Sequence, residues 1–382
     1  MRQAEDELTS LEEEGLLRRL RSLNPGDAPF LLLDGRRIIN FSSNDYLGLA
    51  RDEELVAAAQ EAAARFGAGS GSSRLICGSL SPHHELEETI AAWKNTEAAL
   101  SFSNGYAAAV GTLTSILRRG DVVILDKLSH ACLIDGARLS EATLRVFPHN
   151  NLDKLEQLLA RAREKLPAGA RVLVVTESIF SMDGDRAPLA ELVSIVERHG
   201  ALLLVDEAHA VGVMGMRGEG LVAELGVQEG VTFQMGTLGK AVGSAGGYLA
   251  AERRWIDLIL NNARSFIFST APPPAQVAAS QRGLEIIASA RGRRLRDRLW
   301  ENIALFSRIR DQKSQSSILP VVIGENEAAL RAAENLLKAG FLAPAVRFPS
   351  VPRGSARLRI TLSAAHDEDQ ISALHARLQT LP

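Results

Sequence analysis

Short, continuously apolar runs alternate with amphipathic stretches through the middle of this 382-residue chain. Strands that are apolar on both faces are typical of a mostly parallel sheet that helices cover on both sides. The pattern therefore predicts an α/β fold, and the length of the chain predicts a smaller domain beside the large one. The expected strands lie at residues 98–102, 122–126, 144–148, 172–177, 201–207, 231–236 and 246–251.

The stretches between these runs have the marks of helices. Residues 186–200 carry apolar side chains three and four positions apart, with Pro188 near the start and Gly200 just past the end. A second helix is expected at residues 151–166. After a cluster of prolines, one long arginine-rich helix is expected from about residue 275 to residue 312.

The two ends of the chain have a different pattern from its middle. Apolar positions at helical spacing predict an amphipathic helix over residues 5–23, and the Asp34-Gly35 pair within residues 30–41 predicts a hairpin. The C-terminal part alternates strands and helices in a compact α+β order. The expected division is therefore an N-terminal helix and hairpin at 1–45, a large domain at 46–280 and a small α+β domain at 281–382.

Composition narrows the functional class. The chain has 43 basic and 46 acidic side chains, a net charge of −3, so no broad cationic surface for nucleic acid or an anionic membrane is expected. Cys77 and Cys132 are too few for a disulfide framework and lack zinc-site spacing, which predicts two buried thiols and no metal. The acidic, leucine-spaced start is unlike a signal or transit peptide, and the apolar runs are too short to cross a bilayer. We therefore expect a cytoplasmic protein that acts on small molecules.

Polar side chains follow several of the predicted strands. Ligands of open α/β sheets bind outside the carboxyl ends of the strands, so these side chains are candidates for one site. An acid, an imidazole, a hydroxyl and an amine at adjacent strand ends are what an enzyme needs to hold pyridoxal phosphate (PLP) and use it as an electron sink. The candidates are His130, Glu177, Ser181, Asp206, His209, Thr237 and Lys240.

Each candidate also has a purely structural alternative. Lys240 could be an ordinary solvated lysine, although the glycines around it, at 236, 239 and 243, leave the backbone open to a bulky ring. The remaining alternatives are that Asp206, Ser181, Thr237 and Thr270 cap turns and that His130 and His209 are structural histidines.

Two glycine-containing segments are possible anion sites. Residues 67–79 lack the Lys-Ser/Thr ending of a phosphate loop and follow a helix, so a wall of the substrate cleft, or a plain loop, is the better interpretation. Residues 102–106 follow a strand and place Ser103, Asn104 and Gly105 at an expected helix start. Their amides suit a phosphate, and helix capping alone explains the same residues.

Several longer motifs resemble the α-oxoamine synthase family over nearly the whole chain. The resemblance implies a fold type I PLP enzyme that condenses an amino acid with an acyl thioester and releases carbon dioxide. The implied substrates are L-alanine and a pimeloyl thioester on coenzyme A or acyl carrier protein, with glycine and another acyl-CoA as the alternative. The motifs are FSSNDYLGL (41–49), SFSNGYAA (101–108), LSHACLIDGARLS (128–140), TESIFSMDGDRAPL (176–189), VDEAHAVGVMG (205–215), GTLGKAVGSAGG (236–247), FSTAPPPA (268–275) and RLRITLSAAH (357–366).

The resemblance also implies a role for each cofactor residue. Lys240 would bond covalently to the cofactor and move a proton, Asp206 would pair with the ring nitrogen, and His130 would stack on the ring. These three are the expected catalytic residues. The further cofactor contacts are His209 and Ser181 at the phenolic oxygen, Gly105, Tyr106 and Thr237 near the phosphate, and Ser269 and Thr270 reaching the phosphate across the interface of a homodimer.

Substrate residues follow from the same resemblance. Arg359 would bind the amino acid carboxylate, whose geometry suits a guanidinium, and Asn44 would add a second contact. Arg18 and Ser350 would contact the acyl substrate, with Arg19 as a competitor for Arg18, and His130 would also touch substrate. The departures from the family pattern, Tyr106 and Leu238 where Phe is frequent and Glu207 where Asp is frequent, remove no chemical group from the mechanism.

Overall fold

The computed structural model describes residues 2–165, 167, 169–311 and 313–381. The chain forms two compact units, which we call the small unit and the large unit. The small unit comprises Met1–Tyr46, Met182–Gly184 and Arg298–Pro382, and the large unit comprises Leu47–Ser181 and Asp185–Asp297.

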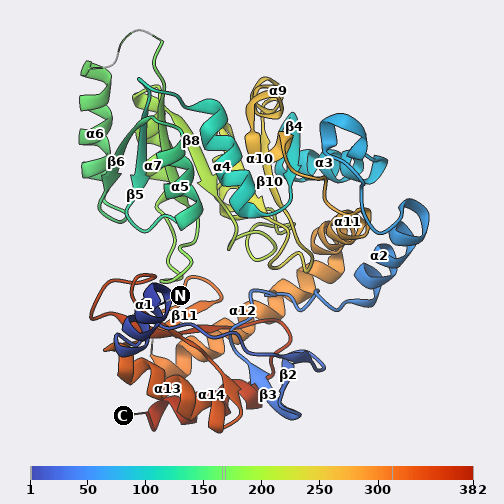
Figure 1. Cartoon of the computed structure of the whole chain (residues 1–382), viewed down its shortest axis with the longest axis vertical. Coiled ribbons are helices and arrows are strands. Elements are labelled where there is room, and N and C mark those ends of the chain that lie inside the picture. Colours follow the sequence, from blue (N-terminus) through green and yellow to red (C-terminus); the bar gives the residue numbers. More distant parts are fainter. Residues whose placement is uncertain (1, 166, 168, 312, 382) are drawn as a thin grey trace. The chain divides into compact units, whose positions relative to one another are not determined.

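A sheet forms the centre of the large unit (Figure 1). It has seven strands in the order β4-β10-β9-β8-β7-β5-β6. The pairs from β6 through β9 are parallel, and only β10 runs antiparallel to its neighbours β4 and β9. This arrangement confirms the predicted fold class. The strands are β4 (Ala98–Phe102), β5 (Val122–Asp126), β6 (Thr143–Phe147), β7 (Val172–Glu177), β8 (Leu202–Asp206), β9 (Phe233–Thr237) and β10 (Gly247–Ala251).

Apolar side chains on both faces of this sheet are buried, as its continuously apolar strands require. Val123 and Leu204 belong to a core cluster with helices α4, α5 and α9, while Ile124 and Leu203, on the alternate face, are also fully buried. Helices α6 and α7 contact β5 and β8. The helices of this unit are α2 (Glu53–Phe66), α3 (Ser81–Lys94), α4 (Gly105–Ile116), α5 (Ala131–Leu139), α6 (Leu152–Lys165), α7 (Leu189–Arg198), α8 (Leu221–Glu224), α9 (Arg253–Asn262), α10 (Arg264–Ile267) and α11 (Pro274–Ala288), with shorter turns at Arg74–Gly78 and Gln228–Gly230.

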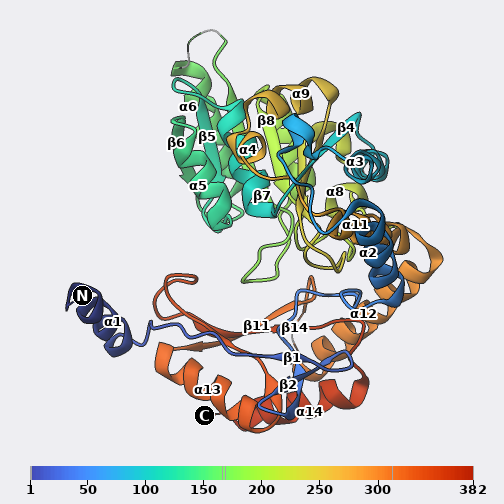
Figure 2. The same ribbon diagram turned by 45° about the vertical axis from the view of Figure 1, so that its right-hand side comes forward.

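The small unit contains two sheets and the last helices of the chain (Figure 2). The predicted hairpin is confirmed: Leu33 pairs with Arg36, and Asp34 and Gly35 between them have φ of 50° and 76°, as a type I′ turn requires. One sheet has the order β1 (Asn24–Pro25), β2 (Phe30–Leu33), β3 (Arg36–Asn40), β12 (Phe341–Leu342) and the other β11 (Ile318–Gly324), β14 (Ala356–Thr361), β13 (Ala345–Val346); the helices are α1 (Arg2–Glu13), α13 (Asn326–Lys338) and α14 (Glu368–Gln379), and α12 (Ala290–Arg310) continues into this unit from the large one.

Two helix predictions are corrected by the structure. Helix α1 ends at Glu13 instead of continuing to residue 23, because Gly15 turns left-handed and the amides of Leu16 and Leu17 both bond the Leu11 carbonyl. The long helix after the prolines is two helices, since the Ser289 hydroxyl accepts the amide of Arg291 and separates α11 from α12. The predicted ends at residues 166 and 312 lie outside the described residues.

The structure also tests the predicted burial of the two cysteines and the prediction that the apolar runs are too short to cross a bilayer. Cys132 is buried, but Cys77 is exposed, so the prediction that both thiols are buried is wrong for Cys77. Cys77 lies in the single turn at Arg74–Gly78, in which the three consecutive residues Leu75, Ile76 and Cys77 are exposed. No helix in the described ranges has the length and apolar character needed to cross a membrane.

Candidate functional site

A cavity lies at the carboxyl ends of β7, β8 and β9 in the large unit. The first turns of α4 and the residues before α5 complete its wall. It brings together seven of the side chains or backbone positions that the sequence predicted for the cofactor: Gly105, Tyr106, His130, Asp206, His209, Thr237 and Lys240, with Cys132, Glu177, Ala208, Met235 and Gly236 as its other lining residues.

Lys240 is held beside an imidazole. Its Nζ lies 2.8 Å from Nε2 of His209, which is buried in the turn after β8. Thr237 shapes the turn that leads to the lysine, because its hydroxyl donates to the Gly246 carbonyl (2.9 Å) and accepts the Gly239 amide (3.2 Å). Thr237 thus has the turn role left open by the sequence, and the amine is placed at the end of β9.

Asp206 is a buried carboxyl group at the end of β8. Its Oδ1 accepts the Ala208 amide at 2.9 Å, so it also caps the following turn. Burial raises the pKa of Asp206, and the nearby charge of Lys240 opposes that rise. The cavity therefore pairs a buried acid with an amine at neighbouring strand ends.

His130 caps the start of α5 with its ring. Nδ1 accepts the Cys132 amide at 3.3 Å and lies 3.0 Å from the Cys132 Sγ. Because an amide can only donate, Nδ1 carries no proton and the ring proton of the neutral imidazole is on Nε2. Burial lowers the pKa of His130, which favours this neutral form. His130 is therefore a hydrogen-bond donor through Nε2.

The start of α4 offers backbone amides to the same cavity. Asn104 caps the helix, its Oδ1 accepting the Ala107 amide at 2.8 Å, and the helix begins at Gly105. Strand β10 packs closely against this turn: a Cβ on Gly247 would lie 2.5 Å from the Asn104 carbonyl oxygen, so only glycine fits. The Tyr106 hydroxyl donates to Asp135 at 2.8 Å, and this hydrogen bond raises the pKa of Tyr106. The first amides of a helix favour an anion such as phosphate.

Three predicted cofactor residues do not line this cavity. Ser181 is buried in the segment that follows β7. Ser269 and Thr270 precede α11, where Thr270 forms an isolated bridge with Ser73. Conversely, Glu177, a strand-end candidate to which the sequence assigned no role, lines the cavity, and so does Cys132, which the sequence analysis did not place in the site.

The small unit orients a guanidinium group on β14. Nη1 and Nη2 of Arg359 both lie 3.3 Å from Oδ1 of Asn44, and the Tyr46 hydroxyl donates to the same oxygen at 3.2 Å. A guanidinium group oriented in this way suits an anionic ligand such as a carboxylate. The structure thus brings together the two predicted carboxylate contacts.

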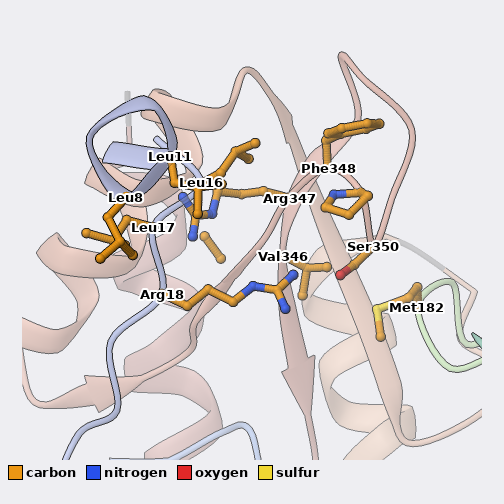
Figure 3. A pocket seen from close by; sticks show the side chains of 12 residues that line it. Leu8, Leu11, Leu16, Leu17, Arg18, Met182, Val346, Arg347, Phe348 and Ser350 are labelled. Carbon is orange, nitrogen blue, oxygen red and sulfur yellow. The ribbon is translucent and has the colours of Figure 1, made fainter. Parts of the chain in front are cut away.

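A second cavity lies within the small unit, between the N-terminal segment and the residues after β13 (Figure 3). Figure 3 shows Arg18 and Ser350 directed into it, opposite a group of leucines. Arg19 instead pairs with Glu12 at 2.9 Å on the surface, so Arg18 is the arginine of the two in the cavity. The lining residues are Leu8, Leu11, Leu16, Leu17, Arg18, Met182, Ala345, Val346, Arg347, Phe348, Pro349 and Ser350.

Comparisons with known proteins identify close relatives. Residues 36–378 match the family described as aminotransferase class I and II. An 8-amino-7-oxononanoate synthase of Anaeromyxobacter dehalogenans is 47% identical over 98% of this chain and 95% of its own. A serine palmitoyltransferase of S. paucimobilis, solved with PLP and myriocin bound, has a TM-score of 0.92 and 29% identity, covering 99% of this chain and 96% of its own. An 8-amino-7-oxononanoate synthase of Francisella tularensis has a TM-score of 0.76 and 26% identity, covering 89% and 96%.

Proposed function

The chain belongs to the class I and II aminotransferase family and within it to the α-oxoamine synthases, and from that premise we propose that it is an 8-amino-7-oxononanoate synthase of biotin biosynthesis. The reaction joins L-alanine to a pimeloyl thioester, on coenzyme A or acyl carrier protein, and releases carbon dioxide and free thiol. The identity of 47% over 98% of the chain to a synthase of this name carries the proposal. The alternative with glycine and a shorter acyl-CoA is not favoured by these relatives.

The large-unit cavity fits the cofactor PLP. It combines a lysine amine, a buried carboxyl group and the amino end of α4, which suit the aldehyde, the ring nitrogen and the phosphate of PLP respectively. When bound, PLP supplies an electron sink for the bond that breaks at the amino acid Cα. Lys240 and Asp206 are the residues that would hold its two reactive ends.

Lys240 would transfer the proton of the substrate, and Asp206 would set the protonation state of the cofactor ring. The Lys240 amine is the base that takes the proton from the alanine Cα and later returns one, and His209, 2.8 Å from Nζ, keeps that amine in place. Asp206 would pair with the ring nitrogen of PLP and keep it protonated, because a negative charge beside that nitrogen favours its protonated form. His209, and Ser181 from the segment after β7, would hydrogen-bond the phenolic oxygen of the cofactor.

His130 acts on the second substrate. Its Nε2–H donates to the thioester carbonyl oxygen and so stabilises the negative charge that develops when the carbon nucleophile attacks. The amides of Gly105 and Tyr106 would bind the cofactor phosphate, and the Thr237 hydroxyl would join them by turning its proton from the Gly246 carbonyl to the phosphate.

The small unit supplies substrate contacts. Arg359, held by Asn44, binds the carboxylate of L-alanine. The leucines of the second cavity, Leu8, Leu11, Leu16 and Leu17, suit the methylene chain of a pimeloyl group, and Arg18 and Ser350 suit its polar end (Figure 3). A seven-carbon diacid chain needs both kinds of surface, whereas an acetyl group needs neither.

We also propose that the protein is a cytoplasmic homodimer in which Ser269 and Thr270 reach the phosphate of the partner's cofactor. Large exposed apolar side chains near Ser269 and Thr270 support this proposal. Phe268, which precedes Ser269, is 70% exposed, and Ile76 is 79% exposed. Thr270 is bridged to Ser73, so the two apolar segments are neighbours in the large unit. Contiguous exposed apolar surface is typical of protein interfaces.

The substitution Lys240→Ala tests the proposed function. It removes the amine that bonds the cofactor and moves the proton, so we expect turnover to fall by at least about 10³-fold and the visible absorbance of the cofactor–lysine bond to disappear. Lys154→Ala, on the surface of α6, is the matched control and keeps both properties. A Lys240→Ala protein with wild-type turnover would sink the proposal.

A further inference from the structure

Glu177 is a buried carboxyl group in the large-unit cavity that the mechanism above does not use. It ends β7, is 2% exposed and lines the cavity. In the ladder between β7 and β8 it is the register partner of Asp206, which is 5% exposed. Register partners on parallel strands point to the same face, so two buried carboxyl groups stand side by side at the cofactor.

The two carboxyl groups have unequal surroundings. Asp206 accepts the Ala208 amide and has the charge of Lys240 nearby. Glu177 accepts the backbone amide of His130, and its Oε1 is buried with no hydrogen-bond partner in the described part of the chain. A buried carboxylate oxygen without a donor is costly, whereas a protonated carboxyl group can itself donate to a ligand.

The charges around Glu177 also favour its protonated form. Asp206 and Asp126 are the anions near it, and Lys240 is the cation. Burial raises the pKa of Glu177 well above its usual range, and the charge of Asp206 raises it further. Two carboxyl groups that share a buried site do not both ionise. Asp206 keeps the charge, because Lys240 is the strongest electrostatic influence on Asp206 and lowers its pKa, whereas the strongest on Glu177 is Asp206 itself, which raises its pKa.

We propose that Glu177 is a neutral carboxylic acid that contacts the cofactor, its free oxygen donating a hydrogen bond to an acceptor of bound PLP while Asp206 carries the negative charge. The inference rests on the proposed function, because PLP is the ligand of that reaction. Through the His130 amide, Glu177 also anchors the residue that leads into α5. The cavity would then offer the Asp206 carboxylate to the ring nitrogen and the Glu177 hydroxyl, as a hydrogen-bond donor, to another acceptor of the cofactor.

The substitution Glu177→Gln keeps a neutral hydrogen-bond donor but cannot carry a negative charge. The substitution Glu177→Ala removes the donor as well as the carboxyl group. Glu207→Gln is the matched control, because Glu207 is also buried but forms an ion pair with Lys94. The probe is PLP itself, titrated into the full-length apo-protein and followed by its absorbance. We expect Glu177→Gln to bind PLP within about threefold of wild type and Glu177→Ala to bind about tenfold more weakly, the size of one hydrogen bond.

Infrared spectra of the apo-proteins report the proton directly. The band of a protonated carboxyl group should be present in the wild type at neutral pH, missing from Glu177→Gln and retained in Glu207→Gln. The inference is overturned if Glu177→Gln loses as much PLP affinity as Glu177→Ala, if Glu177→Ala binds PLP like the wild type, or if Glu177→Gln keeps the band. A wild-type protein that binds no PLP would overturn the proposed function instead, a different result.

Discussion

A thiol group lies beside the ring of His130 in the large-unit cavity. The Cys132 Sγ lies 3.0 Å from Nδ1, and an S–H donor there stabilises the neutral ring with its proton on Nε2. We predict that Cys132→Ala raises the pKa of His130 by less than about one unit, since a thiol is a weak donor and one unit is about 1.4 kcal/mol. Cys132→Ser should keep the low value. An NMR titration of His130 checks both, and an unshifted Cys132→Ala protein would contradict the hydrogen bond.

The contacts of some site residues could be predicted from the sequence, and those of others could not. Lys240 and Asp206 stand directly after apolar runs, and strand ends meet by topology, so their shared cavity was predictable. The partners of Arg359 were not, because the contact with Asn44 spans 315 positions along the chain. The Cys132–His130 contact is local, yet which ring nitrogen it reaches depends on a side-chain rotamer that no spacing specifies.

At the scale of elements, one histidine joins the end of β5 to the segment after β7. His149 Nδ1 lies 3.0 Å from Oδ1 of Asp126, and Nε2 lies 2.8 Å from Oδ2 of Asp185. Burial lowers the pKa of His149, but its two carboxylate partners more than offset that and raise it to about 10. The same segment after β7 carries Ser181, so this contact fixes the loop beside the cofactor cavity.

This element-level contact has a pH signature. A raised folded-state pKa stabilises the protein fully below the unfolded-state value of about 6.5, and that stability is lost as the pH rises through about 10. We therefore predict that His149→Gln lowers the urea midpoint more at pH 6 than at pH 10. Unfolding curves at the two pH values measure this. An equal loss at both would show that the ring is not charged in the folded protein.

Strand positions followed closely from the sequence, and helix ends did so less well. Apolar runs that must be buried on both faces mark strands such as β5 and β8 almost to the residue. The end of α1 depends instead on hydrogen bonds to the Leu11 carbonyl after Gly15 turns left-handed, and the leucine spacing continues past it. The spacing of the leucines alone therefore does not predict where this helix ends.

For the whole molecule, the exposed apolar segments of the large unit predict its assembly. We expect sedimentation equilibrium to give twice the mass of one chain, and we expect the double change Ile76→Asp with Phe268→Asp to give monomers, because charges replace apolar contact area. Val146→Asp, an exposed position on the edge strand β6, is the control that stays dimeric. A dimer unaffected by the double change would place the interface elsewhere.

The central claim is the reaction, and thiol release measures it most directly. Purified protein with PLP is given pimeloyl, succinyl and acetyl thioesters of coenzyme A in turn, each with L-alanine, glycine or L-serine, and the free thiol is counted. Since the cavity of the small unit offers both leucines and Arg18, we predict that the pimeloyl donor with L-alanine has the highest kcat/KM, by at least about 100-fold, the worth of roughly 3 kcal/mol of side-chain recognition. Preference for acetyl-CoA with glycine would contradict the account.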